Sequence, residues 1–414
     1  MTGTEAPLIR TSLAGPRSKA WVDRLAEREC PAITARRSRR ASSIGASDVD
    51  PVVWKRARGA CVEDEDGNRF VDFTSGFGVA SVGHAHPRVV SAGQDQLGRL
   101  PHAMGDAFPD AQRILLLERL SEWTGLEHGI LGSSGSDAVE AALKTARIAT
   151  GRDKVLAFEG AYHGLSYGAL SVSHYKNEMF RAPFEGQLGQ HVSHLPFGTL
   201  PDSLETVGAV LVEPIQGRGG MRCPPESWLS ELAAICERDG ALLIFDEIYT
   251  GFGRSGSRFA YEYAGVRPDL LCLGKGMAGG FPISACMGTK EVMEAWSASR
   301  GEAIHTQTFL GNPVGCAMAL ACMNVLEDEK LFEKSRDDGA WLEARLKSLG
   351  PLRGRGLMRG LEVENSLKLS RRLLENGYIA LPAGLEAEVL AIVPPLNVAR
   401  SQLESFSDCL ESLL

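Results

Sequence analysis

Short apolar runs alternate with segments of helical periodicity through the middle of this chain. The runs are rich in Val, Ile, Leu and Phe, as buried strands are, and they span residues 154–160, 208–214, 241–247, 269–275 and 283–288. Between two of them, residues 226–238 place four side chains on one helical face: Leu229, Leu232, Ala233 and Cys236. This alternation predicts an α/β fold in which helices cover both faces of a mostly parallel sheet.

The two ends of the chain have a different pattern. Residues 1–58 are polar, irregular and rich in Arg and Ser, and residues 60–73 predict two short strands around a turn at Asp66 and Gly67. After residue 328 the chain is more charged, with an exposed helix expected over 328–349 and strands over 356–363 and 389–396. We therefore predict a large domain over 76–328 and a smaller α+β domain that combines 1–75, an arm and hairpin, with 329–414.

The composition favours a globular protein without a nucleic-acid or membrane partner. Of 414 residues, 44 are Lys or Arg and 52 are Asp or Glu, so the formal net charge is −8. The basic cluster Arg36–Arg40 lacks interleaved aromatic residues and is expected to be a solvated surface loop. No run approaches the ~20 apolar residues of a membrane helix, and residues 1–20 lack the apolar core of a signal peptide.

The cysteine pattern bears on location and on metals. Nine cysteines, an odd number, occur without a CxxC pair or a Cys/His spacing typical of a metal site. This pattern favours a reducing compartment over a disulfide framework, so we expect a cytoplasmic protein that holds no metal.

Chemically active residues follow several of the expected strands. Glu213, Asp246 and Lys275 stand at three strand ends, where ligands collect in an open α/β sheet. The loop Gly132–Ser136, with the sequence GSSGS, runs into an amphipathic helix whose first N–H groups are free to bind an anion. Glycines on both sides of Lys275 would let the backbone pass close to a bulky partner.

Each feature also has an ordinary structural interpretation. The loop could be a plain helix cap, Asp246 an ion-pair residue and Lys275 an exposed lysine. Together they match the needs of pyridoxal 5'-phosphate (PLP): N–H donors for the phosphate, an acid for the pyridine nitrogen and an amine for the aldehyde. Tyr162 and Ile248 are candidates to lie against the two faces of its ring.

Over nearly its full length the chain resembles the class III aminotransferases, which are PLP-dependent enzymes of fold type I, and six ordered stretches carry this resemblance. The pattern is closest to the 4-aminobutyrate and acetylornithine type. The stretches are DEDGNRFVDFTSGFGVASVGHAHPRVV, GSSGSDAVEAALKTARIATGRDKVLAFEGAYHG, LVEPIQG, LLIFDEIYTGFGRSG, PDLLCLGKGMAGGFPIS and TFLGNPVGCAMALA.

This resemblance implies a role for each motif residue. Lys275 would be the catalytic residue, bonding covalently to the cofactor aldehyde and then moving the substrate proton. Other cofactor contacts would come from Ser134, Gly135 and Ser136 at the phosphate, Asp246 at the ring nitrogen, Tyr162 and Ile248 on the ring faces, Gln216 at the ring hydroxyl and Glu213 behind them. Thr308 would reach the phosphate of the neighbouring subunit, which implies a homodimer.

The departures from the family pattern concern the substrate. Many members that act on 4-aminobutyrate, ornithine or acetylornithine have an arginine where this chain has Leu165. The glutamate and arginine of the 4-aminobutyrate enzymes are replaced by Arg218 and Ala391. Arg218 is either a surface residue or a substitute for carboxylate recognition. Phe77 either lines the substrate entrance or packs in the core.

These observations predict a ping-pong aminotransferase that moves an amino group from a primary amine or ω-amino acid donor to a 2-oxo acid acceptor. An aminomutase or an amino-acid racemase on the same fold is the alternative. A protein that binds the cofactor without activity is a third possibility, which intact Lys275 and Asp246 disfavour.

Overall fold

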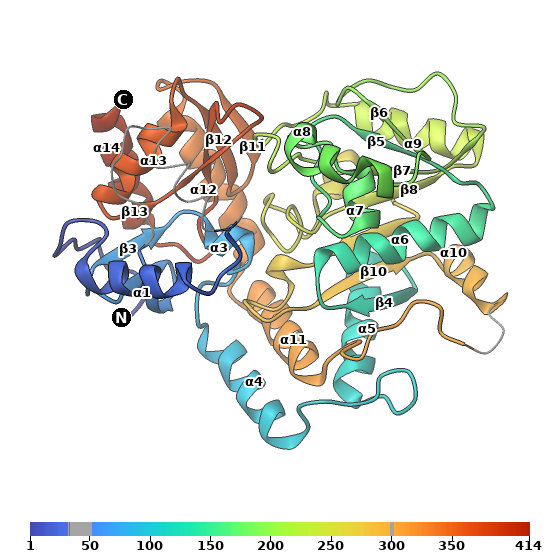
Figure 1. Ribbon diagram of the computed structural model, residues 1–414, viewed down its shortest axis with the longest axis horizontal. Helices are drawn as coiled ribbons and strands as arrows, with labels where there is room; N and C mark the ends of the chain where they lie inside the picture. Colours follow the sequence, from blue (N-terminus) through green and yellow to red (C-terminus); the bar gives the residue numbers. More distant parts are fainter. Residues whose placement is uncertain (32, 34–51, 299–301) are drawn as a thin grey trace.

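The computed structural model describes residues 1–31, 33, 52–298 and 302–414. A seven-stranded sheet forms the middle layer of the lobe on the right in Figure 1. The order across this sheet is β4 (His128–Gly132), β10 (Ser284–Gly288), β9 (Leu270–Leu273), β8 (Leu242–Asp246), β7 (Val207–Val212), β5 (Lys154–Phe158) and β6 (Val192–Leu195). The predicted basic loop Arg36–Arg40 lies outside the described residues.

The central sheet is mostly parallel, as predicted. Strand β10 alone among these seven runs antiparallel to its neighbours, β9 and β4, and the pairs from β9 through β6 are all parallel. The five predicted apolar runs correspond to β5, β7, β8, β9 and β10. Strands β4 and β6 were not predicted, because glycines and polar residues interrupt their short apolar runs.

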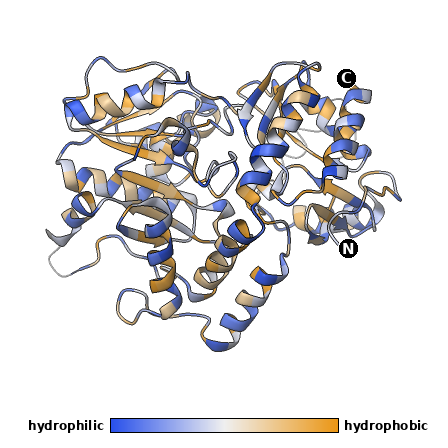
Figure 2. Cartoon of the chain, turned by 180° about the vertical axis from the view of Figure 1, so that it is seen from behind, coloured by the Kyte–Doolittle hydropathy of each residue, from blue (hydrophilic) through white to orange (hydrophobic). Residues whose placement is uncertain are grey.

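Helices cover both faces of this sheet. One apolar cluster joins the sheet to α6 (Gly135–Thr150), α7 (Tyr167–Val172) and α10 (Lys290–Glu294). The cluster on the other face includes side chains of α5 (Ala111–Thr124), α9 (Trp228–Asp239) and α11 (Pro313–Asp328). The predicted apolar face of α9 packs into this second cluster. Figure 2 shows the strands of the sheet as a largely hydrophobic layer between these helices.

A four-stranded sheet combines segments from both ends of the chain. It has the order β1 (Trp54–Arg58), β2 (Cys61–Asp64), β3 (Arg69–Asp72) and β13 (Tyr378–Ile379). The predicted hairpin is confirmed, since β2 and β3 pair antiparallel around a turn where Gly67 has a φ of 82°. The prediction that residues 1–58 are irregular is wrong, because α1 (Pro16–Ala26) and β1 form there.

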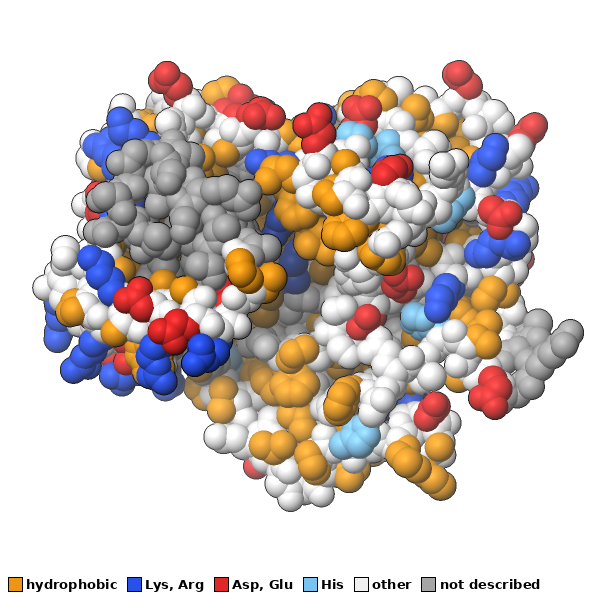
Figure 3. Space-filling model, viewed as in Figure 1, with side chains coloured by type: hydrophobic (Ala, Val, Ile, Leu, Met, Phe, Trp, Pro, Cys, Tyr) orange, Lys and Arg blue, Asp and Glu red, His pale blue; other side chains and the backbone are white. Residues whose placement is uncertain are grey.

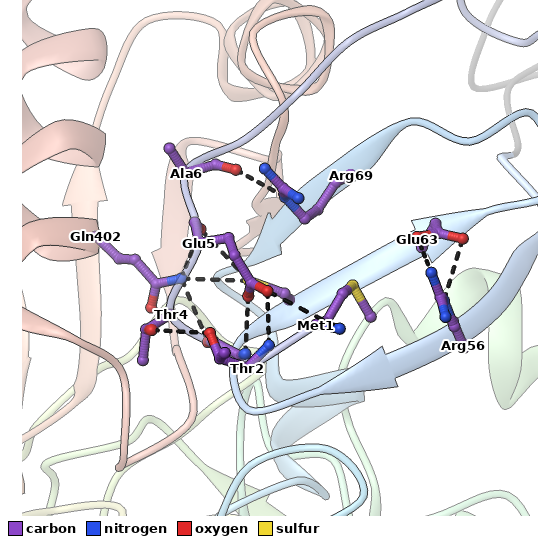
Figure 4. Close-up of polar contacts among 11 residues, drawn as sticks. Met1, Thr2, Thr4, Glu5, Ala6, Arg56, Glu63, Arg69 and Gln402 are labelled. Atoms are coloured by element: carbon purple, nitrogen blue, oxygen red, sulfur yellow. Dashed lines mark hydrogen bonds and ion pairs between the residues drawn. The ribbon is translucent and has the colours of Figure 1, made fainter.

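The first residues are tied to the small sheet by polar contacts (Figure 4). The Glu5 carboxylate accepts hydrogen bonds from the backbone N–H groups of Thr2 and Gly3, at 2.6 and 2.8 Å. Burial alone would raise the pKa of Glu5, but these donors outweigh it and lower the pKa to about 2. The Glu5 carbonyl accepts a bond of 3.0 Å from Gln402 Nε2, which joins this segment to the C-terminal helix α14 (Arg400–Leu413).

The C-terminal part contains a third sheet. Its order is β11 (Leu352–Arg355), β12 (Met358–Glu362), β15 (Val389–Ile392) and β14 (Leu381–Ala383), with helices α12 (Leu331–Leu346) and α13 (Ser366–Glu375) packed nearby. The predicted helix and both strands are therefore present. Because β13 pairs with β3, segments of both termini share one sheet, but the domain boundaries at residues 75 and 328 stay a proposal.

Further helices connect these layers. They are α3 (Ser75–Gly78), α4 (Pro87–Arg99) and α8 (Asn177–Phe180), with 3₁₀ turns η1 (Ala182–Gln187), η2 (Ala260–Ala264), η3 (Lys275–Met277) and η4 (Ala295–Ala298). Helix α3 is distorted, because Gly76 and Phe77 both have left-handed backbone angles.

Candidate active site

The strand-end residues selected from the sequence meet in one cavity of about 330 Å³. Glu213 follows β7, Asp246 ends β8 and Lys275 follows β9, and these parallel strands share one carboxyl edge. Nine predicted site residues line this cavity: Ser134, Gly135, Ser136, Tyr162, Glu213, Arg218, Asp246, Ile248 and Lys275.

The GSSGS loop caps helix α6 and also leaves donors for an anion. The Asp137 carboxylate accepts from the N–H groups of Ser133 and Ser134, each at 2.9 Å, and the Ser134 hydroxyl accepts from Asp137 N–H. The next two first-turn N–H groups, of Gly135 and Ser136, have no intrahelical partner, and both residues line the cavity. The helix-cap and anion-binding interpretations are thus compatible.

Asp246 is buried and held in place by its neighbours. Its Oδ2 lies 2.7 Å from Nδ1 of His163, and its Oδ1 accepts from Ile248 N–H at 3.1 Å. His163 is also buried, and its Nε2 has no hydrogen-bond partner within the described part of the chain. The sequence analysis missed His163, although it stands between Tyr162 and Gly164 in a quoted motif.

Glu213 lines the cavity as a hydrogen-bond acceptor. Its carboxylate accepts from the N–H groups of Tyr162, at 2.8 Å, and Gly217, at 3.0 Å. Burial raises the pKa of Glu213 to about 7, and the nearby charge of Asp246 acts in the same direction. The carboxyl group fixes the backbone that carries the Tyr162 ring.

Lys275 has the character of a nucleophilic amine. Burial lowers its pKa to about 8, against the opposing charges of Asp246 and Glu213. A lowered pKa leaves part of the amine unprotonated near neutral pH, which a nucleophile requires. The Nζ atom lies 4.0 Å from the centroid of the Tyr249 ring, and Tyr249 is a cavity residue that the sequence analysis missed.

The glycines beside Lys275 provide close packing between protein atoms. A Cβ on Gly276 would lie 2.2 Å from Ser81 Oγ, and a Cβ on Gly274 would lie 3.4 Å from Ile248 Cγ2. The expectation that both give clearance for a ligand ring is therefore wrong for Gly276, which makes room for Ser81.

Three predicted residues do not line the cavity. Gln216 is fully buried and its Nε2 donates to the Glu159 carbonyl at 2.9 Å, so its contact with a ring hydroxyl stays a prediction without support from the geometry. Thr308 is exposed on the surface. Phe77 lies within α3 and is 57% exposed, which excludes the core-packing interpretation.

The residues that depart from the family pattern have contrasting surroundings. Arg218 and Leu165 line the cavity, and the Arg218 guanidinium lies 4.2 Å from the centroid of the Tyr162 ring. Ala391 does not line the cavity and is buried in a small apolar cluster that packs against the cavity residue Tyr249. The interpretation of Arg218 as an ordinary surface residue is therefore wrong.

The polar groups that line this cavity fit PLP. The first-turn N–H groups of Gly135 and Ser136 suit a phosphate, and the buried Asp246 suits a protonated ring nitrogen. The described residues contain no cluster of His, Cys, Asp or Glu that could hold a metal ion. Among the same residues, every helix is too short or too polar to span a membrane.

Comparisons with known proteins agree with this site. The family model for aminotransferase class-III matches residues 44–414. An acetylornithine aminotransferase of Methanosarcina mazei is 38% identical, over 87% of this chain and 91% of that protein. An alanine/serine racemase of Pyrococcus horikoshii is 34% identical, over 98% of this chain and 92% of that protein.

Among solved structures, the ornithine aminotransferase of Toxoplasma gondii aligns with a TM-score of 0.81 and 29% identity, over 98% of both chains. That structure is described as having partial occupancy of PLP at its active site. The extent of the family match and the identity to curated relatives decide the assignment. The chain belongs to the class III aminotransferase family.

Proposed function

We propose that this protein is a PLP-dependent aminotransferase that moves an amino group from a primary amine or ω-amino acid to a 2-oxo acid by a ping-pong mechanism. The proposal rests chiefly on one observation, the meeting of Lys275, Asp246 and the N–H groups of Gly135 and Ser136 in a single cavity. PLP, when bound, supplies an electron sink for the bonds around the substrate amino group.

The protein would hold the cofactor at several points. Gly135 and Ser136 would donate to the phosphate, and Asp246, positioned by His163, would bind the protonated ring nitrogen. Tyr162 and Ile248 would contact the ring, since both line the cavity. These contacts would hold the cofactor beside Lys275 and limit the access of water.

Lys275 Nζ would accept the proton from the substrate carbon and deliver it to the cofactor. Its lowered pKa, about 8, makes the amine available as a base near neutral pH. The face of the Tyr249 ring supports the cationic form of Nζ during this transfer.

The function can be tested by the cofactor spectrum of the purified protein. Single-turnover mixing with an amine donor should convert the aldehyde form of the cofactor to the amine form, and pyruvate or 2-oxoglutarate should reverse the change. A scan of amine donors then identifies the substrate. A protein that shows no borohydride-sensitive absorbance, or no conversion with any donor, would contradict the proposal.

A racemase is the second candidate, because the alanine/serine racemase of Pyrococcus horikoshii aligns with 98% of this chain. A racemase inverts an amino acid without a 2-oxo acid acceptor and without net conversion of the cofactor. Exchange of the α-hydrogen with inversion, in the absence of any acceptor, would favour it over the aminotransferase.

Arg218 is proposed to recognise a substrate carboxylate. Among the described residues that line the cavity, it is the one arginine, and the Tyr162 ring holds its guanidinium in place. Many enzymes that act on 4-aminobutyrate, ornithine or acetylornithine have an arginine at the position of Leu165. The leucine has no charge and cannot bind a carboxylate.

The Arg218→Ala variant should therefore raise KM for carboxylate-bearing substrates by about 10- to 100-fold, as expected for a lost charge-assisted hydrogen bond. Arg218→Lys should recover part of this loss. A simple amine donor without a carboxylate serves as the internal control, and its KM should change little. An unchanged KM for every carboxylate substrate would contradict the role of Arg218.

A homodimer is proposed in which Thr308 of one subunit reaches the phosphate in its neighbour's site. The loops around Thr308 expose several large apolar side chains, each more than half exposed: Met104, Phe108, Ile304 and Phe309. Figure 3 shows hydrophobic side chains gathered over the lower part of the molecule. The ring centroids of Phe309 and His102 are 5.5 Å apart, so the loop that contains Thr308 adjoins the loop that contains His102.

The Phe309→Asp variant should shift the protein toward monomers, because a buried charge without a partner destabilises an apolar interface. Light scattering during size-exclusion chromatography measures the shift, and Met179→Asp, on exposed α8, is the control. The affinity for PLP should fall with the dimer, since Thr308 would be withdrawn from the neighbouring site.

A cytoplasmic location stays a prediction from the cysteine pattern.

A further inference from the structure

A second cavity, of about 680 Å³, lies between the third sheet, helix α12 and the loop after β7. It shares no lining residue with the cavity of Lys275. Its charged lining residues are five arginines and one glutamate: Arg222, Arg336, Arg353, Arg355, Arg359 and Glu343. This surface is thus strongly positive on a chain whose formal net charge is −8.

Regular elements bring these arginines together. Arg353 and Arg355 are two positions apart on β11, so their side chains lie on the same face of the strand. Arg359 comes from the neighbouring strand β12. Arg336 and Glu343 are seven positions apart on α12 and so share a helical face. The cluster is therefore part of the folded framework.

One arginine and the glutamate satisfy each other. The Arg359 guanidinium donates to Glu343 at 2.9 Å and to three backbone carbonyls, those of Gly339, Gly354 and Gly356. This pairing uses the one carboxylate that lines the cavity, so the charges of the other four arginines must be balanced elsewhere.

Two of the remaining four arginines, Arg353 and Arg336, pair with carboxylates outside the cavity lining. Arg353 donates through Nε to Glu362 at 2.6 Å. Within the described part of the chain, neither Arg222 nor Arg355 forms an ion pair. The Arg355 guanidinium lies 4.7 Å from the centroid of the Tyr263 ring, a contact that orients the cation without cancelling its charge.

We propose that this arginine-lined cavity binds a small oxyanion with two or more negative charges, carried by phosphate or carboxylate groups. Guanidinium groups present paired N–H donors that match both kinds of oxyanion. Like charges gathered at short range repel one another, and a bound anion removes that repulsion. The volume is within the usual range for small-molecule sites. Arg336 is paired with the exposed Asp337 and therefore adds little net charge.

Calorimetric titration of the PLP-loaded protein tests the proposal, with pyrophosphate and citrate as probes at constant ionic strength. The cofactor must be present because the empty phosphate loop would itself bind pyrophosphate. We expect saturable binding with one site per chain. Binding of pyrophosphate alone would indicate a phosphate ligand, and binding of citrate alone a carboxylate ligand.

Variants locate the binding. Arg353→Ala combined with Arg355→Ala should weaken the affinity at least about 10-fold, as expected for lost charge-assisted bonds, whereas Arg267→Ala, an exposed arginine paired with Glu127, should not change it. Thermal unfolding and the cofactor spectrum check that each variant is folded.

Should the double variant not fold, Arg355→Lys gives the same decision, since it retains the charge and loses the paired donors. No saturable binding of either probe would overturn the proposal. So would an affinity that is unchanged in both the double variant and Arg355→Lys.

Discussion

The Lys275→Ala variant should keep PLP and lose amino transfer. The phosphate donors of Gly135 and Ser136 and the carboxylate of Asp246 stay in place, so the cofactor should still bind. The variant lacks both the nucleophilic amine and the base, and loss of the base alone slows such reactions by about 10²- to 10⁴-fold. Stopped-flow spectra of the half-reaction with an amine donor measure the rate.

Controls separate this effect from misfolding. Lys290→Ala, at an exposed lysine near the start of α10, should leave the rate and the spectrum unchanged. Lys275→Arg keeps a cation but has too high a pKa to act as a base near neutral pH, so it should be as slow as the alanine variant. An alanine variant that turns over near the normal rate would show that Lys275 is not the catalytic amine.

The position of this lysine could be predicted because parallel strands end at a common edge. Glu213, Asp246 and Lys275 were selected as polar residues that follow apolar runs, and the sheet brings all three to one cavity. Two neighbours, His163 and Tyr249, could not be selected on that ground. Their importance depends on contacts, of 2.7 Å to Asp246 and 4.0 Å to Lys275, that no spacing along the chain encodes.

The errors in the fold have similar causes. Strands β4 and β6 have short, interrupted apolar runs, so they are recognisable only beside the strands that pair with them. Helix α1 lies in a polar segment, and Ser18 is its one buried residue, so no pattern of buried apolar positions marks it. The clearance expected around Lys275 was wrong for Gly276, because the side chain that fills that space, Ser81, is far away in sequence.

Asp246→Asn should weaken PLP binding and slow catalysis. An amide cannot hold the ring nitrogen protonated as a carboxylate does, so charge that develops in the reaction is less well stabilised. Loss of one such electrostatic contact costs about 10²- to 10³-fold in rate. The dissociation constant of PLP, from equilibrium dialysis, should also rise. The Asp246 carboxylate contacts His163 at 2.7 Å, so its loss also frees that side chain to move.

Glu247→Gln is the matched control, since Glu247 is the next residue and is equally buried. Its carboxylate accepts from Thr250, Ala260 and Tyr261, and it does not line the cavity. This variant should lower the unfolding temperature with little effect on PLP affinity or on the half-reaction rate. Asp246→Asn should show the opposite pattern. If both variants lost only thermal stability, Asp246 would be a structural residue, and the ring-nitrogen contact would have to be assigned to another group.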